Sequence, residues 1–200
     1  MSAGRNVNTK SQDWCTPKKY VDAVKCFFGG RIDLDPCSNK YSIARAKTEY
    51  CLPTFNGLKE SWNFTTIYVN PPYGINKKNK TTIKDWIERC CEANRLYKSE
   101  VIALVPVATN TRHWKEYIFG RANSICFLDD TRLKFLINGE SNGKGAPMAC
   151  AMIYWGKNAR KFYDVFYKHG AVINITNLIK KKWSPPNIKN QKKLFSIFDK

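Results

Sequence analysis

Residues that bind transition metals are scarce in this chain of 200 residues. It contains only two His, and none of its eight Cys residues forms a Cys-x-x-Cys pair. A zinc site needs such ligands at close, regular spacing, so we expect no bound metal. Several Cys residues stand inside apolar runs, where a thiol behaves as a small hydrophobic group. We therefore expect structural thiols and a reducing cytoplasm.

Long apolar segments are also missing. No run approaches the roughly 20 apolar residues that cross a membrane, and residues 1–9 lack the apolar core of a signal peptide. We therefore expect no signal peptide and no membrane association. Residues 1–12 are polar and are expected to form a flexible lead before the domain.

Acidic residues are few, since 16 Asp and Glu stand against 34 Lys and Arg, which gives a net charge of +18. This excess predicts a polyanionic partner, with nucleic acid ahead of a membrane surface. A lysine-rich composition from an AT-rich genome would raise the charge as well, and this alternative stays open. The apolar content of 43% indicates one globular domain, placed at residues 13–178, followed by a basic tail at 179–200.

Hydrophobic periodicity predicts an alternation of helices and strands. The predicted helices span residues 17–28 (with Thr16 as N-cap), 83–97, 111–119 and 158–168. The predicted strands span residues 31–35, 65–70, 101–107, 124–128, 132–137 and 149–155, while 43–51 fits a strand or a helix followed by a strand. The last two strands look like an antiparallel hairpin. The pattern predicts an α/β fold, a three-layer mixed sheet with a C-terminal antiparallel hairpin. The helix at 83–97 is expected to bury Ile83, Trp86, Ile87, Cys90 and Leu96.

The most informative motif is Asn70-Pro71-Pro72-Tyr73, which directly follows an apolar strand. Two prolines end the strand because neither can donate a ladder hydrogen bond. The motif offers an amide side chain, a backbone carbonyl and an aromatic ring, the groups needed to hold a flat ring that bears an amine. From the tetrapeptide alone, an ordinary Pro-Pro turn is an equal alternative.

Other polar segments fall at predicted strand ends or helix starts. They are residues 13–17, residues 33–38 and residues 56–58, the last followed by Trp62. In a doubly wound sheet such positions converge on one crevice outside the carboxyl ends of the strands. This co-occurrence is more specific than any single motif, and it favours a ligand site over a plain turn.

These residues resemble the phage-type DNA N6-adenine methyltransferases, the phage Dam family, over about residues 12–156. The matching motifs are Trp14-x-Thr16-Pro17, Asp33-Leu34-Asp35-Pro36, Gly57-Leu58 with Trp62, Asn70-Pro71-Pro72-Tyr73-Gly74, Arg132-Leu133-Lys134-Phe135 and Gly145-Ala146-Pro147. The resemblance implies a Rossmann-like class I methyltransferase fold and S-adenosylmethionine as methyl donor. It also implies double-stranded DNA as partner, in the cytoplasm of a bacterium or of a phage-infected host cell. A monomer is favoured.

The resemblance also implies roles for individual residues. The catalytic set is Asn70, Pro71, Pro72 and Tyr73, where the Asn70 amide oxygen and the Pro71 carbonyl accept hydrogen bonds from the adenine amine and Tyr73 stacks on the base. The set expected to bind the cofactor is Trp14, Thr16, Pro17, Asp33, Asp35, Pro36, Cys37, Asn56, Leu58 and Asn70. The set expected to contact DNA is Tyr73, Lys77, Lys78, Lys80, Arg132, Phe135 and Lys144. A core position for Phe135 and a surface ion pair for Arg132 fit equally well.

Two departures from the family pattern leave other functions open. Cys37-Ser38-Asn39-Lys40 stands where many adenine methyltransferases have a Gly-rich loop, and Asn56 stands where relatives have Asp. One alternative is a methyltransferase that acts on RNA or on a protein glutamine. The other is an inactive methyltransferase fold that binds DNA.

Overall fold

A mixed seven-stranded sheet forms the centre of the molecule in the computed structural model, which describes residues 14–76, 79–130, 133–137, 140–141 and 148–178. Its strands are β2 (Leu34–Asp35), β3 (Thr48–Glu49), β4 (Thr66–Val69), β5 (Glu100–Pro106), β6 (Ser124–Leu128), β9 (Cys150–Trp155) and β10 (Gly170–Asn174). They lie in the order β10-β6-β9-β5-β4-β2-β3. The pairs β3–β2, β2–β4 and β4–β5 are parallel, and the remaining pairs are antiparallel.

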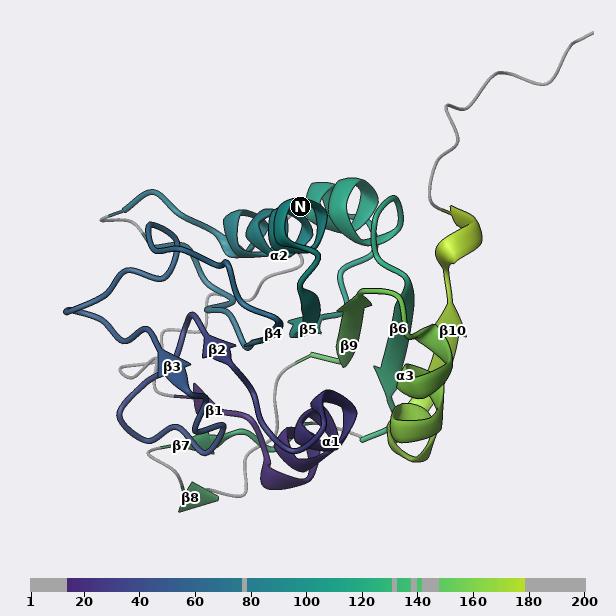
Figure 1. Cartoon of the computed structure of the whole chain (residues 1–200), viewed down its shortest axis with the longest axis horizontal. Helices are drawn as coiled ribbons and strands as arrows, with labels where there is room; N and C mark the ends of the chain where they lie inside the picture. The colour runs from purple at the N-terminus through teal and green to yellow at the C-terminus, as the bar shows by residue number, and fades with distance from the viewer. Residues whose placement is uncertain (1–13, 77–78, 131–132, 138–139, 142–147, 179–200) are drawn as a thin grey trace, which may run out of the picture.

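Helices cover both faces of this sheet (Figure 1). They are α1 (Lys18–Phe28), α2 (Ile83–Tyr97), α3 (Ala159–Phe166), the π-helical segment η1 (Trp114–Ile118) and the 3-10 turns η2 (Tyr167–His169) and η3 (Thr176–Leu178). Helices α1 and α3 pack on one face, whereas α2 and η1 pack on the other. A small antiparallel sheet of β1 (Trp14–Cys15), β7 (Leu136–Ile137) and β8 (Glu140–Ser141) lies beside the central sheet.

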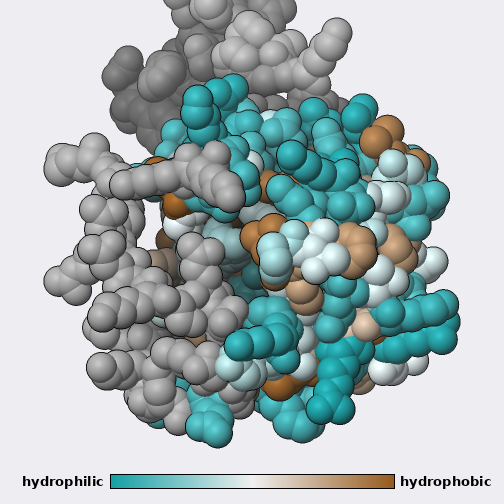
Figure 2. Space-filling view, turned by 90° about the vertical axis from the view of Figure 1, so that its left-hand side faces the viewer, coloured by the Kyte–Doolittle hydropathy of each residue, from teal (hydrophilic) through white to brown (hydrophobic). Residues whose placement is uncertain are grey.

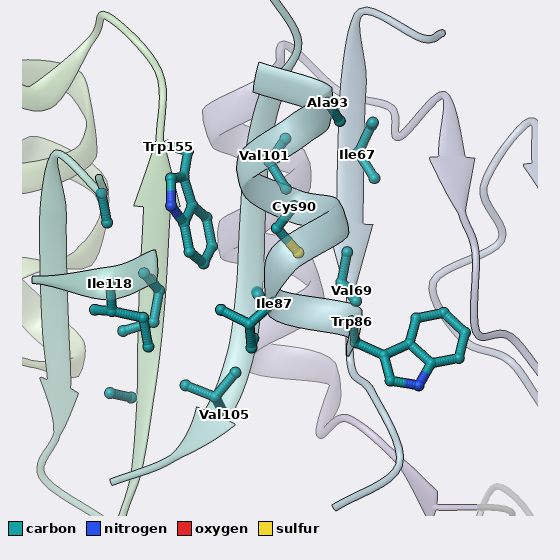
Figure 3. Close-up of a cluster of buried hydrophobic side chains, with 14 of the residues drawn as sticks. Ile67, Val69, Trp86, Ile87, Cys90, Ala93, Val101, Val105, Ile118 and Trp155 are labelled. Atoms are coloured by element: carbon teal, nitrogen blue, oxygen red, sulfur yellow. The ribbon is translucent and has the colours of Figure 1, made fainter. Parts of the chain in front are cut away.

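The sheet divides the core into two clusters, one on each face, because successive side chains of a strand point to opposite faces. On β5, Ile102 and Leu104 contact the cluster under α1 and α3, while Val101, Ala103 and Val105 contact the cluster under α2. Figure 3 shows the second cluster, with α2 lying across β4 and β5. Every residue from 101 to 105 is buried, as expected for a strand covered on both faces.

The strand order reverses at β2, and this reversal positions the candidate site. The chain passes from β2 to β3 on one side and then returns to place β4 on the other side of β2. The carboxyl ends of β2 and β4 therefore flank a topological switch point, where open α/β sheets bind ligands. Asp35 ends β2, and Asn70 follows β4 directly.

The predicted C-terminal hairpin is wrong. Strand β9 pairs with β5 and β6, while β7 pairs with β1 and β8. All six residues of β9 are buried, so this strand needs a neighbour on each side and a helix layer on each face. A hairpin with residues 132–137 would have left it at an edge. The central sheet is mixed as predicted, but the antiparallel strand lies inside it.

Several local predictions also need correction. Thr16 does not cap the first helix, because its hydroxyl pairs with Tyr68, and Pro17 stands at the N-cap. Leu96 is 54% exposed, whereas Ala93 is buried on the core side of α2. Residues 114–118 are π-helical rather than α-helical. Strand β10 had no counterpart in the sequence analysis.

Candidate active site

A pocket opens at the carboxyl edge of the sheet, beside the ends of β2 and β4. Its empty space is about 290 Å³, a figure that includes open solvent. The lining residues are Trp14, Cys15, Thr16, Val21, Asp35, Cys37, Ser38, Asn39, Ser42, Ile43, Ala44, Tyr68 and Asn70. Five of the residues predicted to bind the cofactor line it together, namely Trp14, Thr16, Asp35, Cys37 and Asn70.

The Asn70 side chain is held at the mouth of this pocket by the small sheet. Its amide Nδ2 donates a hydrogen bond of 3.2 Å to the backbone carbonyl of Trp14 on β1. Pro71 is buried and Pro72 is exposed, so the chain reaches the surface at Pro72. The Asn70 amide thus connects β4 to a strand that lies 56 residues earlier in the chain.

Tyr73 turns back toward the protein from this corner. Its hydroxyl lies 3.4 Å from both the Asn70 side-chain oxygen and the backbone carbonyl of Leu104. Its ring meets the buried ring of Phe135 edge-on at 5.9 Å, and Phe135 in turn lies 5.3 Å from the Trp14 ring. Burial raises the pKa of Tyr73 well above its usual value, so its hydroxyl stays protonated and able to donate.

Asp35 is a buried carboxyl group in the pocket wall, only 6% exposed. Burial, with a smaller contribution from the charge of Glu49, raises its pKa to about 7, although the hydrogen bond from the Cys37 backbone N–H to the Asp35 Oδ1 (3.1 Å) opposes the shift. Burial and the neighbouring Asp35 also raise the pKa of the Cys37 thiol. Among the described residues that line the pocket, Asp35 is the one carboxylate, and none is a Lys or Arg. The pocket is thus suited to a cationic ligand.

Three hydroxyl groups also belong to the pocket. The Thr16 and Tyr68 hydroxyls share a hydrogen bond of 2.6 Å, and both residues are buried. The Ser38 hydroxyl is buried beside the Cys51 thiol and makes no hydrogen bond of normal geometry within the described residues. A buried hydroxyl without a partner costs free energy, and a polar ligand in the pocket would give it one.

The segment containing Asn56 and Leu58 packs behind the pocket without lining it. The Asn56 side-chain oxygen accepts the Leu58 N–H at 3.1 Å, and the Trp62 indole donates to the Gly57 carbonyl at 2.7 Å. A Cβ atom on Gly57 would lie 1.7 Å from the Pro36 carbonyl oxygen. Only glycine therefore allows this segment to approach the end of β2 so closely.

Asp33 lies away from the pocket, at the amino edge of the sheet. Its Oδ2 accepts hydrogen bonds from the Thr66 N–H at 3.1 Å and the Thr66 hydroxyl at 2.9 Å. It belongs to a second hollow that contains Arg31, Lys47 and Lys98. Pro17 and the buried Pro36 also do not line the first pocket.

The predicted DNA contacts are placed only in part. Lys80 is exposed, with φ of 53°, in a loop closed by the bridge between Asn76 and Thr81. Phe135 is 4% exposed and packs in the core cluster between Trp14 and Tyr73. Lys77, Lys78, Arg132 and Lys144 lie outside the described residues.

Sequence reasoning missed one wall of the pocket, formed by Ser38, Asn39, Ser42, Ile43 and Ala44, and it also missed Tyr68. The segment after Cys37 had been noticed as a replacement for a Gly-rich loop, and that position should have marked it as a lining segment. Tyr68 carried no signal beyond its place in a strand.

Comparison with known proteins identifies the family. A family model described as DNA N-6-adenine-methyltransferase (Dam) matches residues 4–182. The chain belongs to this family, so it is a DNA adenine-N6 methyltransferase that uses S-adenosylmethionine as methyl donor. No curated protein and no solved structure matches the chain.

The described residues contain no group of three or more His, Cys, Asp or Glu side chains arranged to hold a metal ion. Among the helices described, none is long and apolar enough to cross a membrane.

Proposed function

We propose that the pocket between β2, β4 and α1 holds S-adenosylmethionine and that residues 70–73 present an adenine to it. The residues present fit such a ligand. The buried Asp35 carboxyl matches a ligand that carries positive charge, and the unpartnered Ser38 hydroxyl matches a polar one. The observation that carries the proposal is the placement of Asn70 at this pocket together with Trp14, Thr16 and Asp35.

Asn70 and Pro71 are proposed to activate the adenine amine. The lone pair of this amine is delocalised into the ring, which makes the nitrogen a poor nucleophile. Hydrogen bonds from the amine to the Asn70 oxygen and the Pro71 carbonyl favour a pyramidal nitrogen with an available lone pair. The same two acceptors stabilise the positive charge that develops on the nitrogen as its bond to carbon forms, which is electrostatic stabilisation by preorganised dipoles.

The cofactor, when bound, supplies an electrophilic methyl group on a sulfonium. The protein then has to hold the amine nitrogen close to that methyl and exclude water, and positioning of this kind provides a large share of enzymatic rate enhancement. An adenine stacked inside a duplex cannot reach a pocket edge, so the base has to be flipped out of the helix. Tyr73 is proposed to stack on the flipped base, with Phe135 beneath it as a buried support.

We infer a Rossmann-like class I fold from the arrangement of the strands. Four neighbouring strands, β3, β2, β4 and β5, are parallel, and the order reverses beside the candidate site. This arrangement fits the rule that doubly wound sheets bind ligands at a switch point. The intact motif at residues 70–73 favours an active enzyme over a degenerate DNA-binding fold.

The reaction can be tested with the full chain, S-adenosylmethionine labelled in its methyl group, and duplex DNA. We expect label in the DNA, recovered as N6-methyladenine after hydrolysis. Parallel reactions with RNA and with a protein that bears exposed glutamine should remain unlabelled. Label in either of these and none in DNA would contradict the proposed substrate.

The role of Asn70 can be tested by Asn70→Ala. Loss of one preorganised hydrogen-bonding group lowers kcat by about 10²–10³, while cofactor affinity measured by calorimetry should change only a few-fold. Asn63→Ala is the matched control, because Asn63 is exposed and does not line this pocket. Full turnover by Asn70→Ala would refute the assigned role.

A further inference from the structure

We propose that the backbone carbonyl of Trp14 is a positioning group that fixes which end of the Asn70 amide faces the adenine. The inference rests on the proposed function, and it assigns to the small β1-β7-β8 sheet a role in aligning the reactive motif. The contact that carries it is the 3.2 Å hydrogen bond from the Asn70 Nδ2 to the Trp14 oxygen.

An Asn side chain ends in a donor and an acceptor of nearly equal size. A backbone carbonyl can only accept, so it selects the NH₂ end of the amide and turns the oxygen away. Among the described residues, the Asn70 oxygen is hydrogen-bonded only by the Tyr73 hydroxyl, at the long distance of 3.4 Å, which leaves its second lone pair available. That oxygen is the atom needed to accept a hydrogen bond from the adenine amine.

Three contacts hold the segment that carries the Trp14 carbonyl. Trp14 pairs with Ile137 and Cys15 with Leu136 in the small antiparallel sheet. The Trp14 ring packs on Phe135 at 5.3 Å. Two residues further on, the Thr16 hydroxyl binds Tyr68 on β4, which is two residues before Asn70. The small sheet is thus fastened to β4 next to the residue that it orients.

This arrangement accounts for Asn, rather than Asp, at position 70. A carboxylate there would point an oxygen at the Trp14 carbonyl with no proton between them. It would also share the pocket with the Asp35 carboxyl, in a wall that offers no Lys or Arg among its described residues. The other titratable groups facing this position are Cys15, Cys37, Tyr68 and Tyr73. A neutral carboxylic acid, by contrast, could donate its proton to the Trp14 oxygen.

Asn70→Asp therefore gives a pH-dependent defect. The turnover of this variant is compared with that of wild type at each pH between 6 and 9. Above the pKa of the introduced carboxyl group, we expect this ratio to fall by about tenfold per pH unit, because only the neutral acid is oriented correctly. Unfolding by urea supplies a readout that needs no activity. The folded state favours the neutral form of the introduced acid, so the pKa of this group is raised, and the destabilisation relative to wild type should be small near pH 4 and grow as the pH rises.

Asn174→Asp is the matched control. The Asn174 oxygen accepts the Thr176 N–H at 2.9 Å on the exposed strand β10, a role that a carboxylate fills equally well, so no pH-dependent defect is expected there. The double variant Asp35→Asn/Asn70→Asp removes the charge of Asp35 and so distinguishes its effect from that of the Trp14 carbonyl. We expect the pH-dependent destabilisation to persist in this variant, because the Trp14 carbonyl remains.

Three results would overturn this inference: equal turnover and stability of Asn70→Asp and wild type at every pH, a defect that does not change with pH, or disappearance of the pH dependence in the double variant. None of them bears on whether the wild-type protein methylates DNA, which the labelling experiment decides by itself.

Discussion

At the scale of the residue, Asp35 carries a carboxyl group whose ionisation destabilises the folded state. Its carboxyl is buried in the pocket wall and has a pKa of about 7. An acid whose pKa is higher in the folded than in the unfolded chain destabilises the fold, and this cost appears as the pH rises from about 4 to 7. Retaining a carboxyl at such a position is typical of a binding site, where stability is commonly sacrificed for function.

Replacement of Asp35 by Asn should therefore stabilise the protein at neutral and alkaline pH. The amide oxygen can still accept the Cys37 N–H, and the pKa difference corresponds to a gain of about 4 kcal/mol at pH 8 that vanishes near pH 4. Urea unfolding at several pH values measures it.

Asp22→Asn, which removes an exposed carboxylate paired with Lys18, is the control for Asp35→Asn and should have little effect. Cofactor affinity should fall in Asp35→Asn if the carboxyl faces the bound ligand. A variant that is no more stable than wild type at pH 8 would show that the buried carboxyl imposes no cost.

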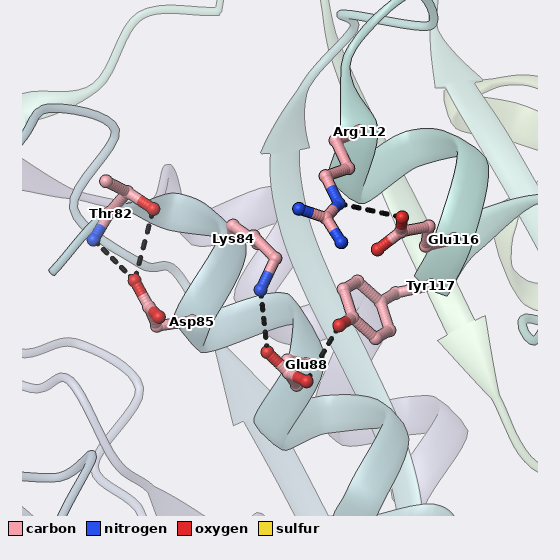
Figure 4. Close-up of polar contacts among 7 residues, drawn as sticks. All are labelled: Thr82, Lys84, Asp85, Glu88, Arg112, Glu116 and Tyr117. Carbon is pink, nitrogen blue, oxygen red and sulfur yellow. Dashed lines mark hydrogen bonds and ion pairs between the residues drawn. The ribbon is translucent and has the colours of Figure 1, made fainter.

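At the scale of the element, a few side-chain contacts hold neighbouring strands and helices in register. Asp33 binds the backbone and hydroxyl of Thr66 and so ties β2 to β4 at their amino ends. Glu88 on α2 accepts hydrogen bonds from Lys84 at 3.0 Å and from Tyr117 of η1 at 2.7 Å, which joins the two helical segments on one face of the sheet (Figure 4). The closest approach is that of Gly57 to Pro36.

A methyl group on Gly57 should disrupt this approach. Because the clash is with backbone, Gly57→Ala forces the segment at 56–58 away from the end of β2, and we expect a loss of about 1–3 kcal/mol or more in the free energy of unfolding. Gly74→Ala is the matched control, since nothing lies within 4 Å of its added Cβ atom. Equal stability of the two variants would contradict the close packing.

At the scale of the whole molecule, charge and surface character suit a nucleic-acid partner. The chain carries a net charge of +18. The face at the β3 edge is mainly hydrophilic, with only small, separated hydrophobic areas (Figure 2). A chain with this excess of positive charge binds a polyanion through counterion release.

DNA affinity should consequently fall steeply with salt. Contacts to about six phosphates would reduce affinity by roughly 10³ between 50 and 200 mM salt. Lys80→Glu should lessen the slope by about one contact, whereas Lys168→Glu, an exposed change of the same charge, should not. A flat salt response would mean that the positive charge serves another purpose.

Much of the local structure could be predicted from the sequence. The helix predicted at 83–97 matches α2, and the strand predicted at 124–128 matches β6, because periodicity and capping residues are local signals. Five of the residues predicted for the cofactor meet in one pocket. The segment from Ser38 to Ala44 was missed because an irregular chain has no period to read. Asp33 was expected near the pocket because the resemblance treats residues 33–36 as one motif, whereas Asp33 precedes β2 and therefore lies at its amino end.

The sequence by itself determined the alternation of elements, the excess of positive charge and the Asn-Pro-Pro-Tyr motif after β4, since each depends on residue type and short spacing. Only the tertiary structure decided that β9 lies between β5 and β6, that Asp33 lies at the edge opposite Asp35, and that the Trp14 carbonyl holds the Asn70 amide across 56 residues. These outcomes depend on contacts between segments that are distant in the sequence. The free energy of such contacts depends on the packing of the whole core, so the local sequence around each residue does not predict them.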